Sequence, residues 1–322
     1  MRSGAIASLC FTLAAGPLAA RDIVLNPPIA CDLQSDCYIQ QYVDHDPSDN
    51  AMDFRCAPLT YDTHKGTDFA LRSLAQMEAG VDVIPAAPGT VRATRDGMAD
   101  QVYTPALAAQ IDGRECGNGL VIDHGGGWST QYCHLKRGSI KVAKGDRVDL
   151  TKVLGQVGLS GRTQFPHVHM TLRKDNNVID PFDPDGQITC GAPSTDTLWQ
   201  DPPPYRPGGI LRVGFADAVP EFATIKAGKA HADILTAKAP ALVVFAYIFG
   251  GRAGDKVTLR IDGPDGVFMD ETVTLEKDQA QLFRAVGKRH RADWTSGAYS
   301  GTASLIRDDT VISTEQGTLR IP

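Results

Sequence analysis

The chain has 322 residues, of which 42% are hydrophobic and 22% are charged, and its formal net charge is −6. These values are ordinary for a globular protein and leave room for about two domains. A mildly acidic chain without a basic cluster argues against nucleic-acid binding.

The first twenty residues have the pattern of a secretory signal peptide. Arg2 gives a positive start, residues 5–15 form an apolar run, and Ala19-Ala20 offers small residues for cleavage before Arg21. The run is too short for a membrane span, and a retained N-terminal anchor is the alternative. No other stretch is long and apolar enough to cross a bilayer, so we expect a periplasmic or secreted protein without a membrane span once residues 1–20 are removed.

Six cysteines remain in the mature chain: Cys31, Cys37, Cys56, Cys116, Cys133 and Cys190. An even number after a signal peptide indicates disulfides formed in an oxidising compartment. Cys116 and Cys133 flank a predicted hairpin and are the best-supported pair, while Cys31 with Cys37 would close a small loop and leave the last two to pair. Cysteine-ligated zinc is the rival interpretation, which the lack of a Cys-x-x-Cys spacing disfavours.

Residues 21–60 read as an irregular, disulfide-containing N-terminal segment with one strand at 38–43. His45 lies there between two aspartates and is interpreted as a loop residue rather than a ligand. Residues 61–200 carry mainly strand and turn patterns, with Gly125-Gly126-Gly127 as a hairpin turn. The strands predicted in this part cover residues 89–94, 119–124, 128–135 and 153–158. Residues 71–79 and 104–111 are either short helices or inserted loops, and neither has a clear cap.

Prolines and glycines in residues 201–209 predict a linker, because proline stiffens the chain and removes backbone donors. Residues 210–322 contain about seven short alternating runs and no helix pattern, which predicts a β-sandwich of immunoglobulin-like type. The turn Gly263-Pro264-Asp265-Gly266 separates two of these runs. His231 and His290 are expected at the surface. The predicted fold class is therefore all-β, with two β domains in series.

Histidines recur in three short blocks. In Pro166-His167-Val168-His169, a strand would project His167 and His169 from one face, since side chains alternate along a strand. A second block places His64 four residues before Asp68. Gly66 between them favours a loop that leads into a strand, where the turn of the chain brings the two side chains together.

The third block is Tyr132-Cys133-His134-Leu135, at the end of a predicted strand. Alternation would place Tyr132 and His134 on one face and Cys133 on the other. Cys133 would then be free to form a disulfide while His134 points into a groove.

In this order, the three blocks resemble the lysostaphin/LytM-type zinc metallopeptidases, a family of peptidoglycan endopeptidases. Residues 117–125, 142–148 and 155–161 resemble the framework segments between the family's motifs. The resemblance covers about residues 55–185. It implies an antiparallel β-sheet metallopeptidase domain, which we place at residues 61–200, before the linker and the β-sandwich.

The resemblance also implies one Zn²⁺ per chain, with His64, Asp68 and His169 as ligands and His134 and His167 as catalytic residues. Hydrolysis by zinc requires three protein ligands and an open position for water. Two neutral imidazoles and one carboxylate leave the ion with a net positive charge, which lowers the pKa of bound water toward ~7. His134 and His167 would orient this water, move its proton and bond the developing oxyanion, and the sequence leaves open which one is the base.

The implied function is hydrolysis of peptide bonds in peptidoglycan stems or cross-links, with the wall peptide as substrate. The alternative is a non-catalytic LytM-type binding module that activates other wall hydrolases. Such modules typically lose metal ligands, whereas this chain keeps all five positions. A secreted protease that acts on proteins, or a bacteriolytic toxin, would share the same chemistry. The sequence does not identify the partner of the C-terminal domain, which could recognise the wall, bind a partner protein or brace the groove.

Residues 71–82 and 97–116 look like insertions relative to the family, and we expect them to wall the substrate groove. Asn118 and Arg162 are candidates for substrate contact, and Tyr132 either lines the groove or belongs to the core.

His124 has no place in the motif and is expected to be structural or exposed. Residues 21–55 could cover the groove, with His45 or Asp44 at the fourth zinc position, although the cysteines of this segment favour a structural tie.

Overall fold

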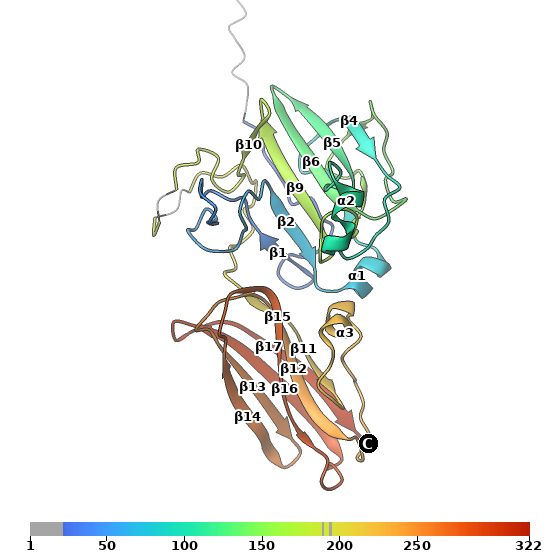
Figure 1. Cartoon of the computed structure of the whole chain (residues 1–322), viewed down its shortest axis with the longest axis vertical. Helices are drawn as coiled ribbons and strands as arrows, with labels where there is room; N and C mark the ends of the chain where they lie inside the picture. The colour runs from blue at the N-terminus through green and yellow to red at the C-terminus, as the bar shows by residue number, and fades with distance from the viewer. Residues whose placement is uncertain (1–21, 189, 193–194) are drawn as a thin grey trace, which may run out of the picture.

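The computed structural model describes residues 22–188, 190–192 and 195–322 (Figure 1). The predicted signal peptide, residues 1–20, therefore lies outside the described residues. Within the described ranges, no helix has the length and apolar character needed to cross a bilayer.

The N-terminal half is built on one antiparallel sheet, drawn in the upper part of Figure 1. Every strand pair in it is antiparallel, and the short β10 (Asn177–Ile179) extends β9 as a hairpin. The other strands follow one another in the order β1 (Cys37–Gln41), β2 (Thr67–Leu71), β9 (His167–Lys174), β6 (Trp128–Leu135), β5 (Asn118–Gly125), β4 (Gly89–Arg95) and β7 (Arg147–Val148). The strands predicted at 38–43, 89–94, 119–124 and 128–135 are confirmed within one or two residues.

Other predictions in this half need correction. The strand expected at 153–158 is reduced to β8 (Gly155–Gln156), which pairs only with β3 (Asp82–Val83). The ambiguous stretch at 71–79 contains the helix α1 (Leu74–Ala79). This helix does have a cap, because the Ser73 side chain accepts a hydrogen bond from the Gln76 N–H. The stretch at 104–111 forms two short turns, η1 (Pro105–Leu107) and α2 (Ala108–Ile111).

Side chains along β9 alternate between the two faces of the sheet, with hydrophobic residues on one face and the histidines on the other. Val168, Met170 and Leu172 point into a buried hydrophobic cluster that also takes in residues of β2, β5 and β6. His167 and His169 therefore project from the opposite face of the sheet. Burial of the apolar set fixes the register of β9, because a slip of one residue would exchange the two faces.

Three disulfides join Cys31 to Cys37, Cys56 to Cys190 and Cys116 to Cys133, as expected. They indicate an oxidising compartment. The N-terminal segment is tied to the sheet by more than its cysteines, because β1 pairs with β2 and Leu25 bridges to Trp199.

The C-terminal half consists of two antiparallel sheets that pack over one hydrophobic cluster, as in a β-sandwich. Residues 263–266 form the turn that joins two of the strands, as predicted. One sheet contains β11 (Gly209–Ala216), β12 (Ala241–Gly251) and β15 (Gln279–Arg289). The other contains β14 (Gly266–Thr274), β13 (Lys256–Gly263), β16 (Gly297–Arg307) and β17 (Thr310–Ile321).

Two details of the C-terminal half differ from expectation. A short helix, α3 (Phe222–Ala227), interrupts the strands. His231, which was expected at the surface, has a side chain that is only 12% exposed and accepts a hydrogen bond from the Phe215 N–H. The helix could not be read from periodicity, since six helical residues give too short a pattern.

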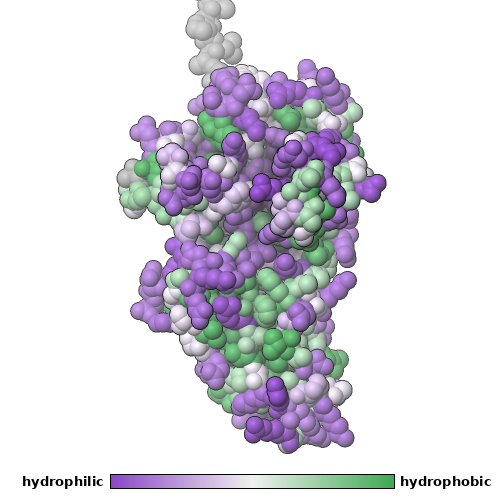
Figure 2. Space-filling view, in the orientation of Figure 1, coloured by the Kyte–Doolittle hydropathy of each residue, from purple (hydrophilic) through white to green (hydrophobic). Residues whose placement is uncertain are grey.

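The two halves meet along β1 and β12. Tyr38 is fully buried against Phe249, with ring centroids 4.6 Å apart, and the Gln281 amide donates to Gln40. The Arg72 guanidinium also donates to the Leu211 carbonyl across this boundary. On the face shown in Figure 2, hydrophobic residues gather over the lower body, where the C-terminal sheets lie.

Candidate metal centre

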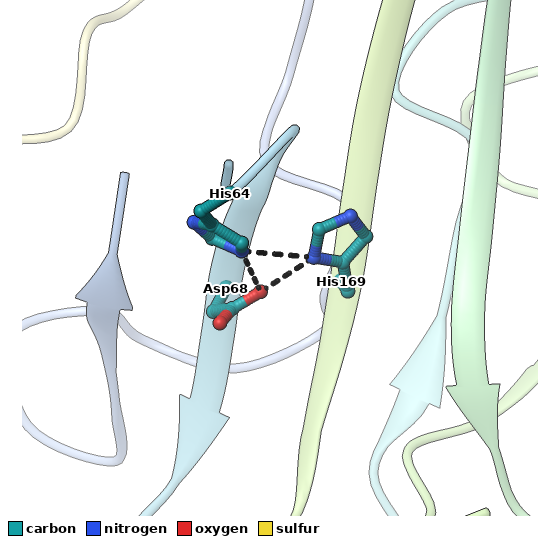
Figure 3. Close-up of side chains that lie close together, drawn as sticks. All are labelled: His64, Asp68 and His169. Carbon is teal, nitrogen blue, oxygen red and sulfur yellow. Dashed lines mark hydrogen bonds and ion pairs between the residues drawn. The ribbon is translucent and has the colours of Figure 1, made fainter. Parts of the chain in front are cut away.

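Three side chains converge on one point, two of them from the neighbouring strands β2 and β9 and one from the loop before β2 (Figure 3). His64 precedes β2, Asp68 lies within it, and His169 is the residue of β9 that pairs with Asp68. Paired residues of an antiparallel ladder project to the same face, so the register brings Asp68 and His169 together. Asp68 Oδ1 lies 3.2 Å from His64 Nε2 and 2.8 Å from His169 Nδ1, and these two nitrogens are 3.1 Å apart.

The outer nitrogen of each histidine is held by a protein oxygen. His64 Nδ1 donates to the Tyr42 carbonyl at 2.6 Å, and His169 Nε2 lies 2.9 Å from Thr171 Oγ1. When His169 Nε2 is the donor to Thr171, both inner nitrogens carry lone pairs that face each other and the Asp68 carboxylate. Two lone pairs and an anion at this separation repel unless a cation lies between them. The separations of 2.8, 3.1 and 3.2 Å between the ligand atoms are close to the roughly 3.3 Å that tetrahedral ligation of zinc at ~2.0–2.1 Å gives. The three residues therefore fit a zinc ion.

The remaining two predicted residues lie beside this group. His167 Nδ1 is bound by the Phe165 carbonyl at 2.9 Å, and its Nε2 is 3.4 Å from Asp68 Oδ1. His134 Nδ1 is bound by the Ser160 carbonyl at 2.7 Å. The rings of His134 and His167 are 4.7 Å apart between centroids. All five residues singled out in the sequence thus lie in one cluster, and each imidazole is oriented by a second protein group.

The backbone conformation that directs His134 into the cluster differs from the predicted alternation along β6. Tyr132 is buried in the core and pairs with Met170, whereas Cys133 pairs with His169 on the side of the site. Simple alternation would therefore send His134 into the core. A register shift between β5 and β6 and a positive φ of 64° at His134 turn its side chain back toward His167 and His169. The prediction that Tyr132 and His134 share a face is wrong for this reason.

This unusual backbone at His134 is fixed on both sides. Its N–H donates to the Cys116 carbonyl at 2.8 Å, and Cys116 is linked to the preceding Cys133 by a disulfide. A left-handed conformation costs energy for a residue with a side chain, so it persists where neighbours enforce it. The disulfide therefore helps to position His134.

Burial and mutual charge set the protonation of the cluster. Burial, followed by the charges of His167 and His169, lowers the pKa of His134 well below its usual value. Burial also lowers the pKa of His169, against the opposing hydrogen bond of Asp68. Burial alone would raise the pKa of Asp68, but His64 and His167 hold it well below its usual value. Neutral imidazoles and an ionised carboxylate are the states that a divalent cation requires.

His64 differs from the other histidines of the cluster. Burial alone would lower its pKa, but the charge and hydrogen bond of Asp68 raise it overall. A bound cation would therefore compete with a proton at His64.

Sequence reasoning missed three contributors. A Cβ on Gly66 would lie 2.6 Å from His169 Nε2 and 2.6 Å from the Met170 carbonyl oxygen, so only glycine fits there. Thr171 orients His169, and its position two residues along β9 was the available signal. The Tyr61 ring lies 4.5 Å from the His64 ring and is 52% exposed at the edge of the site.

Two other residues considered from the sequence, Asn118 and His124, have structural roles. Asn118 is fully buried and its side chain binds backbone groups of Met98 and Leu135, so its predicted substrate contact is wrong. His124 is held by the Pro88 carbonyl and Thr130, as expected for a structural histidine.

The histidine of the N-terminal segment and the predicted arginine also have clear positions. His45 pairs with Asp180 at 2.8 Å rather than with the cluster, which fits its interpretation as a loop residue. Arg162 is exposed and lies 5.6 Å over the Tyr103 ring, within the inserted segment 97–116.

Part of the chain is similar in sequence to known peptidases. Residues 62–181 match the model of peptidase family M23. The peptidoglycan DD-endopeptidase ShyA of Vibrio cholerae is 34% identical over 109 residues, which is 34% of this chain and 20% of that protein. The chain thus spans about a fifth of the length of this curated relative.

Two solved structures are also similar. A zinc-containing peptidase from Vibrio cholerae has a TM-score of 0.34 at 24% identity, covering 49% of this chain and 39% of the other. The catalytic domain of lysostaphin from Staphylococcus simulans has a TM-score of 0.26 at 20% identity, covering 37% of this chain and 76% of the other.

Proposed function

The chain contains a peptidase family M23 domain, and on that premise we propose that it is a zinc-dependent endopeptidase that cleaves peptide bonds in peptidoglycan stems or cross-links. The observation that carries the proposal is the convergence of His64, Asp68 and His169 with two further histidines beside them. A binding module would have no need of two extra imidazoles at the mouth of a metal site. The curated relative, a peptidoglycan endopeptidase, supports the choice of substrate.

His64, Asp68 and His169 are the proposed zinc ligands, with one ion per chain. When bound, zinc would polarise the scissile carbonyl and lower the pKa of a water molecule at its open position. Tyr42 and Thr171 support the ligands: the Tyr42 carbonyl fixes the tautomer of His64, and Thr171 Oγ1 holds the orientation of the His169 ring.

His134 and His167 are the proposed catalytic residues. A backbone carbonyl engages Nδ1 of each ring, which leaves Nε2 of each to exchange a proton with water or to bond the oxygen of the scissile carbonyl. The lowered pKa of His134, caused by burial and then by its histidine neighbours, keeps that ring neutral. The disulfide beside His134 holds the ring in place for this task.

We propose residues 61–200 as the catalytic domain, 201–209 as the linker and 210–322 as an immunoglobulin-like sandwich. The sandwich braces the catalytic sheet through Tyr38 and Phe249, which lie between the two halves. The proposed location is the periplasm or the outside of the cell, in keeping with the three disulfides.

Metal analysis and peptidoglycan digestion together test the function. We expect about one zinc per chain and release of new amine and carboxyl ends from purified peptidoglycan. His169→Ala should lose both zinc and activity, whereas His167→Ala should keep zinc and lose at least about 100-fold in activity. His290→Ala, outside the site, is the matched control and should keep both. A wild-type protein that binds no zinc and cleaves nothing would instead support the binding-module alternative.

A further inference from the structure

A short loop before β9 holds both proposed catalytic histidines. The Ser160 carbonyl accepts a hydrogen bond from His134 Nδ1 at 2.7 Å, and Thr163 Oγ1 lies 3.1 Å from His167 Nδ1. Ser160 is fully buried and Thr163 is 4% exposed, so the surrounding structure fixes both residues. Arg162 lies between them in the chain and is exposed. The backbone therefore places Arg162 at the edge of the cluster.

This loop is anchored by the inserted segment 97–116. The Arg162 N–H donates to the Glu115 carbonyl at 2.8 Å, and the Tyr103 N–H donates to the Thr163 carbonyl at 2.8 Å. Arg162 Cζ lies 5.6 Å from the centroid of the Tyr103 ring, a cation–π contact that limits where the side chain can point. Arg162 is thus an exposed side chain on a fixed backbone.

The charge of Arg162 also acts on the part of the site that holds His64. Tyr61 and His64 belong to the loop before β2, and their rings are 4.5 Å apart. Burial, followed by the charge of Asp68, raises the pKa of Tyr61, whereas the charge of Arg162 opposes this rise. Exposed charges act strongly only within about 10 Å, so the guanidinium lies near Tyr61. Arg162 and Tyr61 therefore flank the cluster.

Arg162 has no counter-charge within the protein. In the part of the chain that the structure describes, its guanidinium forms no ion pair and no hydrogen bond. The neighbouring Glu115 side chain accepts a hydrogen bond from the Gly113 N–H instead, and the Asp68 carboxylate is shared among three histidines. The five N–H donors of the Arg162 guanidinium are therefore available to an anion at the site.

We propose that Arg162 determines substrate specificity by binding a carboxylate of the peptide substrate near the scissile bond. This assignment rests on the proposed endopeptidase function and names the chemical class of its substrate. A guanidinium matches a carboxylate with two parallel N–H···O bonds, which a neutral amide cannot reproduce. The carboxylate belongs either to the C-terminus of a stem peptide or to an acidic side chain, and both sources present the same two oxygens.

Three cross-linked peptides of one sequence test the proposal. The first has both carboxylates free, the second has its C-terminus amidated, and the third has its acidic side chain amidated. We expect wild-type protein to lose at least about 10-fold in kcat/KM, chiefly through KM, for one of the two amides. The amide that is cleaved poorly identifies the bound carboxylate.

Variants of Arg162 then link this preference to the guanidinium. Arg162→Gln should cleave the free-acid peptide no faster than wild type cleaves the poor amide, and should no longer distinguish these two peptides. Arg162→Lys keeps the charge without the planar fork and should keep only part of the preference. Arg291→Gln, at an exposed arginine of the C-terminal half, is the matched control and should keep the full preference.

Binding measured apart from cleavage separates this proposal from the proposed function. Calorimetry uses the full chain with a chelator present, so that no peptide is cleaved. Wild type should bind the free-acid peptide at least about 10-fold more tightly than the poor amide, and Arg162→Gln should bind the two equally.

The contrary outcomes are distinct. Equal binding and equal cleavage of all three peptides by wild type would overturn the role of Arg162 and leave the endopeptidase standing. Equal slowing of all three peptides in Arg162→Gln would also overturn it, and would make the arginine a support of the loop. Wild-type protein that cleaves none of the peptides would overturn the proposed function, while the calorimetry would still decide whether Arg162 binds a carboxylate.

Discussion

Gly66 gives the most direct test of how the two strands hold the metal centre. It lies between His64 and Asp68, next to β9, and an added Cβ would come within 2.6 Å of both His169 Nε2 and the Met170 carbonyl oxygen. Ordinary contact begins at 3.4 Å, so Gly66→Ala must open about 0.8 Å between β2 and β9 or push the His169 ring aside. The Met170 oxygen is part of the backbone and cannot rotate away.

A shift of this size matters because metal ligands tolerate displacements of only about 0.2 Å. We therefore expect Gly66→Ala to weaken zinc binding about 10- to 100-fold, the range seen when the support of a ligand is lost. Hydrolysis should fall in proportion at limiting zinc. The metal-free protein should lose only about 1–3 kcal/mol of stability, as for other overpacked sites.

Chelator competition gives the zinc dissociation constant, and thermal unfolding of the metal-free protein checks the fold. Gly155→Ala in β8 is the matched control, because its nearest atom outside its chain neighbours is Ser139 Oγ at 3.2 Å and β8 pairs with β3, not with β2 or β9. Zinc affinity within about twofold of wild type in folded Gly66→Ala would refute the argument that close approach of β2 and β9 sets the ligand geometry.

Two further predictions concern groups that support the site. Replacing Cys116 and Cys133 together by serine removes a restraint on the strained backbone of His134. We expect kcat to fall about 10-fold or more while zinc binding is retained. An equal loss of zinc binding would contradict this prediction. Burial alone would lower the pKa of His45, but Asp180 raises it overall. The pair therefore stabilises the fold fully at pH values below the unfolded pKa of about 6.5, and this stabilisation is lost as pH rises through the folded pKa. His45→Gln should therefore lower the Tm more at pH 6 than at pH 9, and a pH-independent difference would be evidence against the pairing.

Much of the fold could be predicted because its signals are local. The glycines at 125–127 have positive φ and join β5 to β6, and their composition alone indicated a turn. Seven alternating runs gave the two C-terminal sheets, and the even cysteine count gave three disulfides. The weak points were short elements: α3 and α1 contain six residues each, which is too few for a helical period to appear.

The sequence by itself predicted which residues gather in the cluster: a two-residue period places His167 and His169 on one face of a strand, and the resemblance of the three blocks to a known family implied His64, Asp68 and His134. Only the tertiary structure decided how they meet: Asp68 faces His169 through the register of β2 and β9, and His134 joins them through a positive φ against the alternation of β6. The pair of His45 and Asp180 is also a tertiary feature, since these residues lie 135 positions apart in the sequence. Local periodicity reports which face a side chain takes, whereas long-range pairing and packing fix what that face encounters.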